Sequence, residues 1–109
     1  MSKVLEVDWS SRLQAAKHIE VDRLPEMMED PEWLVRRMVA RRIHSSRLPE
    51  MMKDPSWHVR RSVAFRISPR FLSCMFFLEH YATVRIILQD RLESEVSCLL
   101  QDEATTHPT

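Results

Sequence analysis

The sequence contains no glycine and no asparagine in its 109 residues. Glycine supplies the positive φ angles of tight hairpin turns and the close backbone approach of phosphate-binding loops, so we expect neither feature. No apolar run approaches the ~18 residues that a membrane-spanning helix needs, and residues 1–6 lack the apolar centre of a signal peptide. These absences predict a cytoplasmic protein with no membrane partner.

An excess of one charge is also lacking. The 16 Lys and Arg residues balance the 16 Asp and Glu residues, so no net field draws the chain toward nucleic acid. The five histidines show no metal-type spacing with one another or with the two cysteines. We therefore expect no catalytic residues, no metal site and no cofactor, and we do not expect an enzyme.

A repeated phrase is the strongest positive signal. Arg-Leu-Pro-Glu-Met-Met occupies residues 23–28 and again residues 47–52, 24 residues later. The same step joins an aromatic column and two apolar columns: Trp9, Trp33, Trp57 and Tyr81; Leu24, Leu48, Leu72 and Val96; Ala16, Ala40, Ala64 and Leu88. Such a period predicts stacked repeats that share core positions. We expect one domain over residues 1–102, with units at about 6–29, 30–53, 54–77 and 78–102, and a disordered tail at 103–109.

Each unit is predicted to contain one long and one short helix. Val35, Val39 and Ile43 recur at four-residue steps and define the buried face of a long helix. Asp30-Pro31 is typical of the start of such a helix, with an acidic cap and proline in the first turn. The segment after Ser46, a candidate cap, allows about two turns of α or 3₁₀ helix. The fold class is therefore an all-α helical-repeat solenoid, which we expect to be right-handed.

An acidic residue also lies six positions before an arginine in every unit. The pairs are Glu6 with Arg12, Asp30 with Arg36, Asp54 with Arg60, and Glu79 with Arg85. Each arginine falls inside the apolar arc of its helix, where a cation needs a counter-charge. We interpret these residues as a structural ladder in which the acid of the same or the next unit is the partner; the alternative is a ligand site. Pairing Glu79 with Arg85 implies a one-residue insertion in the fourth unit.

The phrase Asp-Pro-x-x-x-Val-Arg-Arg-x-Val-Ala-x-Arg-Ile, at residues 30–43 and 54–67, resembles the leucine-rich repeat variant family. That resemblance implies α-helices alternating with 3₁₀ helices in a right-handed superhelix. The acid-to-arginine spacing is also similar to that of HEAT repeats, which are longer. Some members of the variant family carry a cysteine-ligated iron–sulfur cluster and resemble proteins encoded with nitrogen-fixation genes. A four-iron cluster needs about four thiolates, so that part of the resemblance does not extend to this chain.

The two cysteines, Cys74 and Cys98, stand one repeat apart. Equivalent positions in adjacent units lie roughly 10 Å apart, which is too far for an unstrained disulfide. We interpret them as small, half-buried residues in a reducing compartment. The alternative is a pair of metal ligands completed from outside the chain.

Two predicted surfaces suit binding. The first is basic and consists of Arg37, Arg41 and Arg61, with Lys17, on the outward faces of the long helices. Four further residues, His18, Arg42, Arg66 and Arg91, lie near helix C-termini, where a cation interacts favourably with the helix dipole; the alternative is contact with an acidic partner or a nucleic-acid backbone. The second surface is apolar and includes Phe71, Phe77 and Leu78, of which the last two replace Lys53 and Asp54 of the preceding unit.

These surfaces predict a non-catalytic protein–protein interaction module with an unidentified protein partner. The apolar residues also favour a homodimer through the C-terminal half, because the open end of a repeat array is adhesive unless a polar unit covers it. The first alternative is a HEAT-like protein that binds nucleic acid through its basic helix faces. The second is an accessory protein of a metal or redox system, which the family resemblance implies.

Overall fold

The structure, a computed structural model, describes residues 8–106 and the side chains of residues 8–97. The described residues form helices and short connections, with no strand among them. In chain order the elements are α2 (Trp9–His18), η1 (Val21–Met27), α3 (Trp33–Arg42), η2 (Ser45–Met51), α4 (Trp57–Arg66), η3 (Pro69–Phe71), α5 (Leu72–Leu78) and α6 (Ala82–Thr106). The letter η denotes a 3₁₀ helix. Both forms predicted for the short segments therefore occur.

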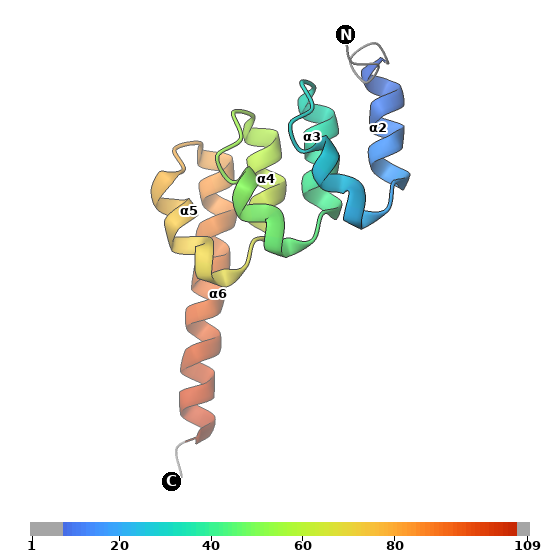
Figure 1. Cartoon of the computed structure of the whole chain (residues 1–109). Helices are drawn as coiled ribbons and strands as arrows, with labels where there is room; N and C mark the ends of the chain where they lie inside the picture. Colours follow the sequence, from blue (N-terminus) through green and yellow to red (C-terminus); the bar gives the residue numbers. More distant parts are fainter. Residues whose placement is uncertain (1–7, 107–109) are drawn as a thin grey trace.

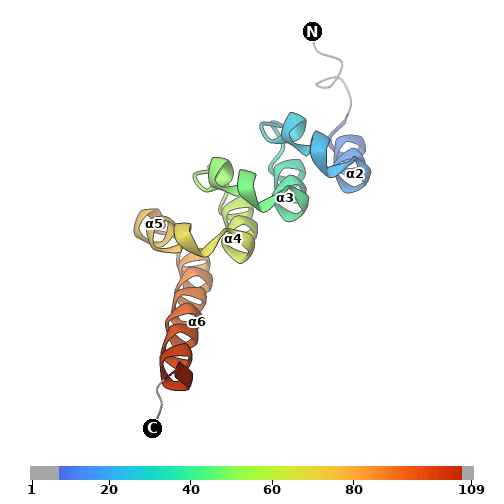
Figure 2. The same cartoon turned by 60° about the horizontal axis from the view of Figure 1, so that its bottom comes forward.

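The long helices lie side by side in sequence order, and the short helices form a second layer in front of them (Figures 1 and 2). Helix α3 packs between α2 and α4, and α4 packs on α6. Each short helix packs on the long helix that follows it, as η1 does on α3 and η2 on α4. The result is an elongated body with principal extents of 68 × 29 × 17 Å. The all-α helical repeat is confirmed, and the right-handed sense of its superhelix stays a prediction.

The core is a continuous layer between the rows of long and short helices. It is built from the predicted columns, because the fully buried side chains recur one repeat apart: Leu24, Leu48 and Leu72; Val35, Val59 and Val84; Val39, Val63 and Leu88; Ala16, Ala40 and Ala64. The step from the third to the fourth unit is 25 residues in two of these columns, as the predicted insertion requires. Because each unit contributes only a few buried side chains, its stability depends on its neighbours.

The fourth unit differs from the prediction. Helix α6 runs without a break from Ala82 to Thr106, and no short helix follows its first half. Val96, predicted to lie in the core column of Leu24, is 55 % exposed. Residues 103–106 belong to α6 rather than to a disordered tail, and residues 107–109 lie outside the described part of the chain. The physical reason is the absence of proline between residues 70 and 107, so nothing in this segment forces the helix to end.

The helix starts also differ in detail. Helix α3 begins at Trp33, and Asp30 is not its cap; the Asp30 carboxylate instead accepts the N–H of Glu32 at 2.9 Å, in a turn before the helix. Asp54 does the same with the N–H of Ser56, also at 2.9 Å. The cap of η2 is His44, whose ring nitrogen accepts the N–H of Ser46, so the prediction of Ser46 as the cap is wrong.

The aromatic column lies on the surface rather than in the core. Trp57 stacks on His58, with ring centroids 3.7 Å apart, and on Tyr81, at 4.7 Å. His58 also stacks on Trp33 at 4.2 Å. The rings thus form a ribbon along the starts of the long helices. Trp9 and Tyr81, at opposite ends of the column, are 46 % and 39 % exposed, because these rings pack on their neighbours and leave one side in water.

Candidate interaction surfaces

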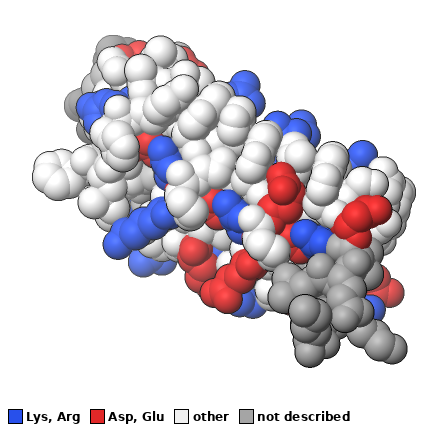
Figure 3. Space-filling view, turned by 90° about the horizontal axis from the view of Figure 1, so that it is seen from above, with Lys and Arg blue, Asp and Glu red and all other residues white. Residues whose placement is uncertain are grey.

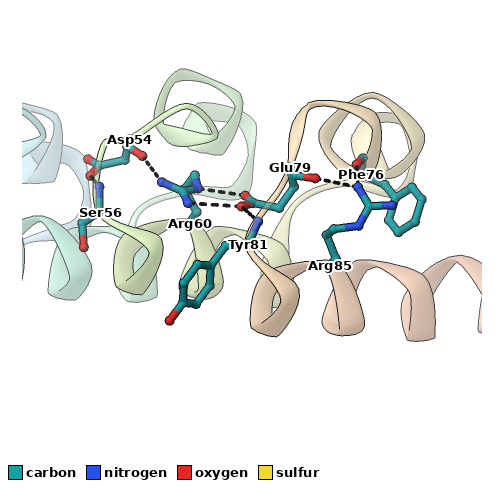
Figure 4. Close-up of polar contacts among 7 residues, drawn as sticks. All are labelled: Asp54, Ser56, Arg60, Phe76, Glu79, Tyr81 and Arg85. Atoms are coloured by element: carbon teal, nitrogen blue, oxygen red, sulfur yellow. Dashed lines mark hydrogen bonds and ion pairs between the residues drawn. The ribbon is translucent and has the colours of Figure 1, made fainter.

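The predicted ladder joins each unit to the next. Both oxygens of each acid accept from one guanidinium, with Nε–carboxylate distances of 2.8 Å for Arg12 with Asp30, Arg36 with Asp54, and Arg60 with Glu79. In the second and third units the same arginine also donates to the main-chain carbonyl of its own unit's acid, as Arg60 does to Asp54 at 2.7 Å (Figure 4). Glu6, the first predicted acid, lies outside the described residues.

The ladder is also well satisfied electrostatically. Glu79 is 5 % exposed, and burial alone would raise its pKa. The hydrogen bonds from Arg60 and from the N–H of Tyr81, together with the charge of Arg60, outweigh burial and hold the pKa of Glu79 below its usual value. Within the described residues no buried side-chain nitrogen or oxygen lacks a hydrogen-bond partner. The geometry therefore favours a structural role for the ladder over a ligand site.

Arg85 ends the ladder differently. Its guanidinium donates to the carbonyls of Glu79 and Phe76, at 2.6 and 3.0 Å, and lies 4.0 Å from the centroid of the Phe76 ring (Figure 4). Within the described residues it forms no ion pair with a carboxylate. The carbonyls and the ring take the place of the next unit's acid, because a cation is attracted to the face of an aromatic ring.

A second arginine ladder joins the other ends of the long helices. Arg42 donates to the carbonyl of Ala16 at 2.6 Å. Arg66 donates to the carbonyls of Ala40 and Ile43, and Arg91 to those of Ala64 and Ile67, at 2.7 to 3.0 Å. Each arginine thus caps the C-terminal end of the preceding long helix, whose last carbonyls have no partner within that helix. The helix-dipole interpretation identified the right ends but the wrong helix, and these three side chains are occupied.

The three remaining predicted arginines form a groove between α3 and α4. We call it the arginine groove and define it by Arg37, Arg41, Arg61 and Phe65, which line a hollow of about 240 Å³ together with Ser62 and Arg66. The guanidinium of Arg37 lies 5.3 Å from the Trp33 ring, and that of Arg61 lies 5.0 Å from the Phe65 ring. None of the helices α2, α3 and α4 contains an acidic residue.

The charges are sorted between the two layers of helices. In the view from above, Lys and Arg side chains line the upper edge, over the long helices, and Asp and Glu side chains gather lower down, over the short helices (Figure 3). The groove therefore carries a local positive charge that the zero net charge of the whole chain conceals.

The predicted apolar surface is largely exposed. Phe77 and Leu78, at the end of α5, are 86 % and 49 % exposed. Phe71 is half-buried against the core, beneath the guanidinium of Arg70, and contributes less than the sequence suggested. A hollow of about 390 Å³ adjoins Leu78, and another of about 600 Å³ is lined by Phe76, Leu92 and Val96. We call Phe76, Phe77, Leu78, Leu92 and Val96 the apolar end.

The cysteines are not brought together as a described site. Cys74 lies on α5 and is exposed, so the prediction that it is half-buried is wrong. Cys98 lies in α6, and its side chain is outside the described residues. In the described part of the chain, no three His, Cys, Asp or Glu side chains are grouped so that they could hold a metal ion. No helix in that part has the length and apolar character needed to cross a membrane.

Comparison with known proteins adds no relative. No family model matches the chain, no curated protein matches it, and no solved structure matches it. The resemblance to leucine-rich repeat variants and HEAT repeats therefore rests on the repeated phrase and its period.

Proposed function

We propose that this chain is a non-catalytic protein-interaction module of the helical-repeat type and that it binds a protein partner through the apolar end. The observation that carries the proposal is the 86 % exposure of Phe77. The equivalent position in the preceding unit is Lys53, so the repeat accommodates a charged residue here. An aromatic ring left in water at a position that tolerates lysine is typical of a contact residue.

The surroundings of Phe77 support this proposal. Leu78 and Met75 line the hollow on one side of it, and Phe76 and Val96 line the hollow on the other. An apolar side chain of a partner could enter either hollow while Phe77 is buried against the partner's surface. Burying a phenylalanine side chain contributes about 1.5–3 kcal/mol, which is the size of contribution that interface anchors make.

The titrating groups support the non-catalytic part of the proposal. The carboxyls with a lowered pKa are Asp8, Glu50 and Glu79. The first-named causes that lower them are hydrogen bonds to Ser11, Arg47 and Arg60 respectively. A capped helix start, an exposed ion pair and a ladder rung account for these shifts without a reacting group.

Site-specific crosslinking tests the proposal. A photoreactive phenylalanine analogue replaces Phe77 in the native cell, and the matched control carries the analogue in place of Val21, which is 41 % exposed on η1. We expect a protein adduct at position 77 that is absent at position 21 and is lost when Leu78 is also changed to Lys. An adduct of the chain with itself would identify the homodimer that the sequence predicts. Equal labelling at both positions would contradict the proposal.

Nucleic-acid binding is a second candidate because Arg37, Arg41 and Arg61 gather in one groove that contains no acid. A phosphate backbone binds to such a groove in a salt-dependent way. Titration of labelled duplex and single-stranded DNA at two salt concentrations tests this. Salt-sensitive binding that Arg37→Glu and Arg61→Glu weaken, and that Arg23→Glu on η1 leaves unchanged, would favour this candidate over the first.

A further inference from the structure

The outer surface formed by the long helices carries opposite charges in neighbouring halves. The basic half is the arginine groove on α3 and α4. The acidic half lies on α6, where Asp90 and Glu93 line a shallow hollow with Ile86 and Gln89. Ile86 stands 25 residues after Arg61, the step that also relates Val84 to Val59, so it occupies the same outward position on its helix. Both halves therefore face the same side of the molecule.

Each half also exposes one large apolar side chain. Phe65 on α4 is 52 % exposed, and Ile86 on α6 is 67 % exposed. Asp90 and Glu93 are exposed, and the only side-chain bond recorded for Glu93 is from Gln89 at 3.2 Å. Within the described residues, neither Arg61 nor Asp90 has an ion-pair partner in its own chain. Two sets of complementary groups thus lie side by side without satisfying each other.

We propose that this face binds a second copy of the chain across a two-fold axis between α4 and α6. A two-fold contact uses the same patch on both copies, so a patch must be complementary to itself after the rotation. Here the rotation places Arg61 and Phe65 of one copy opposite Asp90, Glu93 and Ile86 of the other. The same contacts then form twice, once on each side of the axis, and bury both apolar side chains.

The charges on this face favour a second copy over nucleic acid. A polyanion that follows the outer face from α3 to α6 would meet Asp90 and Glu93 directly after Arg61, and like charges at that point oppose binding. An end-to-end stack of two copies is also disfavoured. Gln89 stands where Ala16, Ala40 and Ala64 are buried against the next long helix, so a helix added in that register would meet a longer polar side chain.

Sedimentation velocity over a range of concentrations, with the variants Arg61→Glu and Asp90→Lys, tests the proposal. We expect the native chain to dimerise and each variant alone to raise the dissociation constant at least about tenfold, because like charges then face each other twice. Mixing the two variants should restore a dimer, since one contact pairs the new glutamate with the new lysine and the other pairs native Arg61 with native Asp90. Matched controls on η1, Arg23→Glu and Asp22→Lys, should dimerise like the native chain.

The failure of this proposal can be told apart from that of the function proposed above. The variant Phe77→Lys changes the apolar end, and it should leave this dimer intact. A native chain that stays monomeric at every concentration would overturn the dimer, as would dimers that the two variants do not weaken or a mixture that does not recover. If Arg61→Glu instead abolished duplex DNA binding by a monomeric native chain, nucleic acid would take the place of the second copy.

Discussion

Replacing Arg60 with methionine tests whether the ladder holds the units together. The change keeps an unbranched apolar stem but removes the guanidinium that binds both Glu79 and the carbonyl of Asp54. The Glu79 side chain is only 2 % exposed, and that of Arg60 is 13 % exposed. In Arg60→Met the carboxylate would keep the N–H of Tyr81, at 3.0 Å. A buried charge would then be left without a counter-charge.

The expected loss of stability follows from this burial. Removing one partner of a buried ion pair costs about 3–5 kcal/mol. Because water reaches part of the Arg60 side chain, we expect a loss of about 2–4 kcal/mol in the free energy of unfolding. The matched control is Arg47→Met, since Arg47 pairs with Glu50 and their side chains are 44 % and 51 % exposed. An exposed pair contributes at most about 1 kcal/mol.

Urea unfolding followed by far-UV circular dichroism and by tryptophan fluorescence measures both variants. Two probes are needed because a repeat array can lose one unit before the others. A loss below about 1 kcal/mol for Arg60→Met, or one equal to that of Arg47→Met, would refute the reasoning. The double variant Arg60→Met with Glu79→Leu should regain part of the stability, because an apolar pair can replace a buried ion pair.

Two further predictions concern acid and helix ends. The pKa of Glu79 is lower in the folded chain than its model value of 4.5, so its stabilising contribution is present above about pH 4.5 and is lost as the pH falls further; Glu79→Gln should therefore flatten the acid side of the stability curve, and an unchanged slope would contradict this. Arg66→Ala removes the donors to the Ala40 and Ile43 carbonyls and should cost about 1–3 kcal/mol in urea unfolding. Its control Arg41→Ala should stay within about 0.5 kcal/mol of the native chain, and equal losses would show that Arg66 does not act as a cap.

The sequence by itself determined the repeat and most of the core. A 24-residue period with apolar columns can be satisfied only if equivalent positions stack, so residues such as Leu24 and Val39 had to be buried. It also determined that the ladder arginines need acidic partners, since a cation on an apolar face must be neutralised. The candidate binding residues Arg37, Arg61 and Phe77 followed from the same periodicity, because it shows which positions point away from the core.

The tertiary structure decided which groups meet. In one dimension the acid of the same unit and the acid of the next are equally available to Arg36; only the packing of α3 against α4 shows that Asp54 provides the carboxylate and Asp30 the carbonyl. The second ladder was not apparent because its acceptors are main-chain carbonyls, which every residue has. The course of α6 was missed because a column of apolar residues fits one continuous helix as well as two short ones.

The division between sequence and structure has a single physical cause. Periodicity fixes the direction in which each side chain points from its own helix, and this is a local property of the backbone. Pairing, stacking and the self-complementary charges of α4 and α6 depend on the distance between helices, which is set only when neighbouring units pack together.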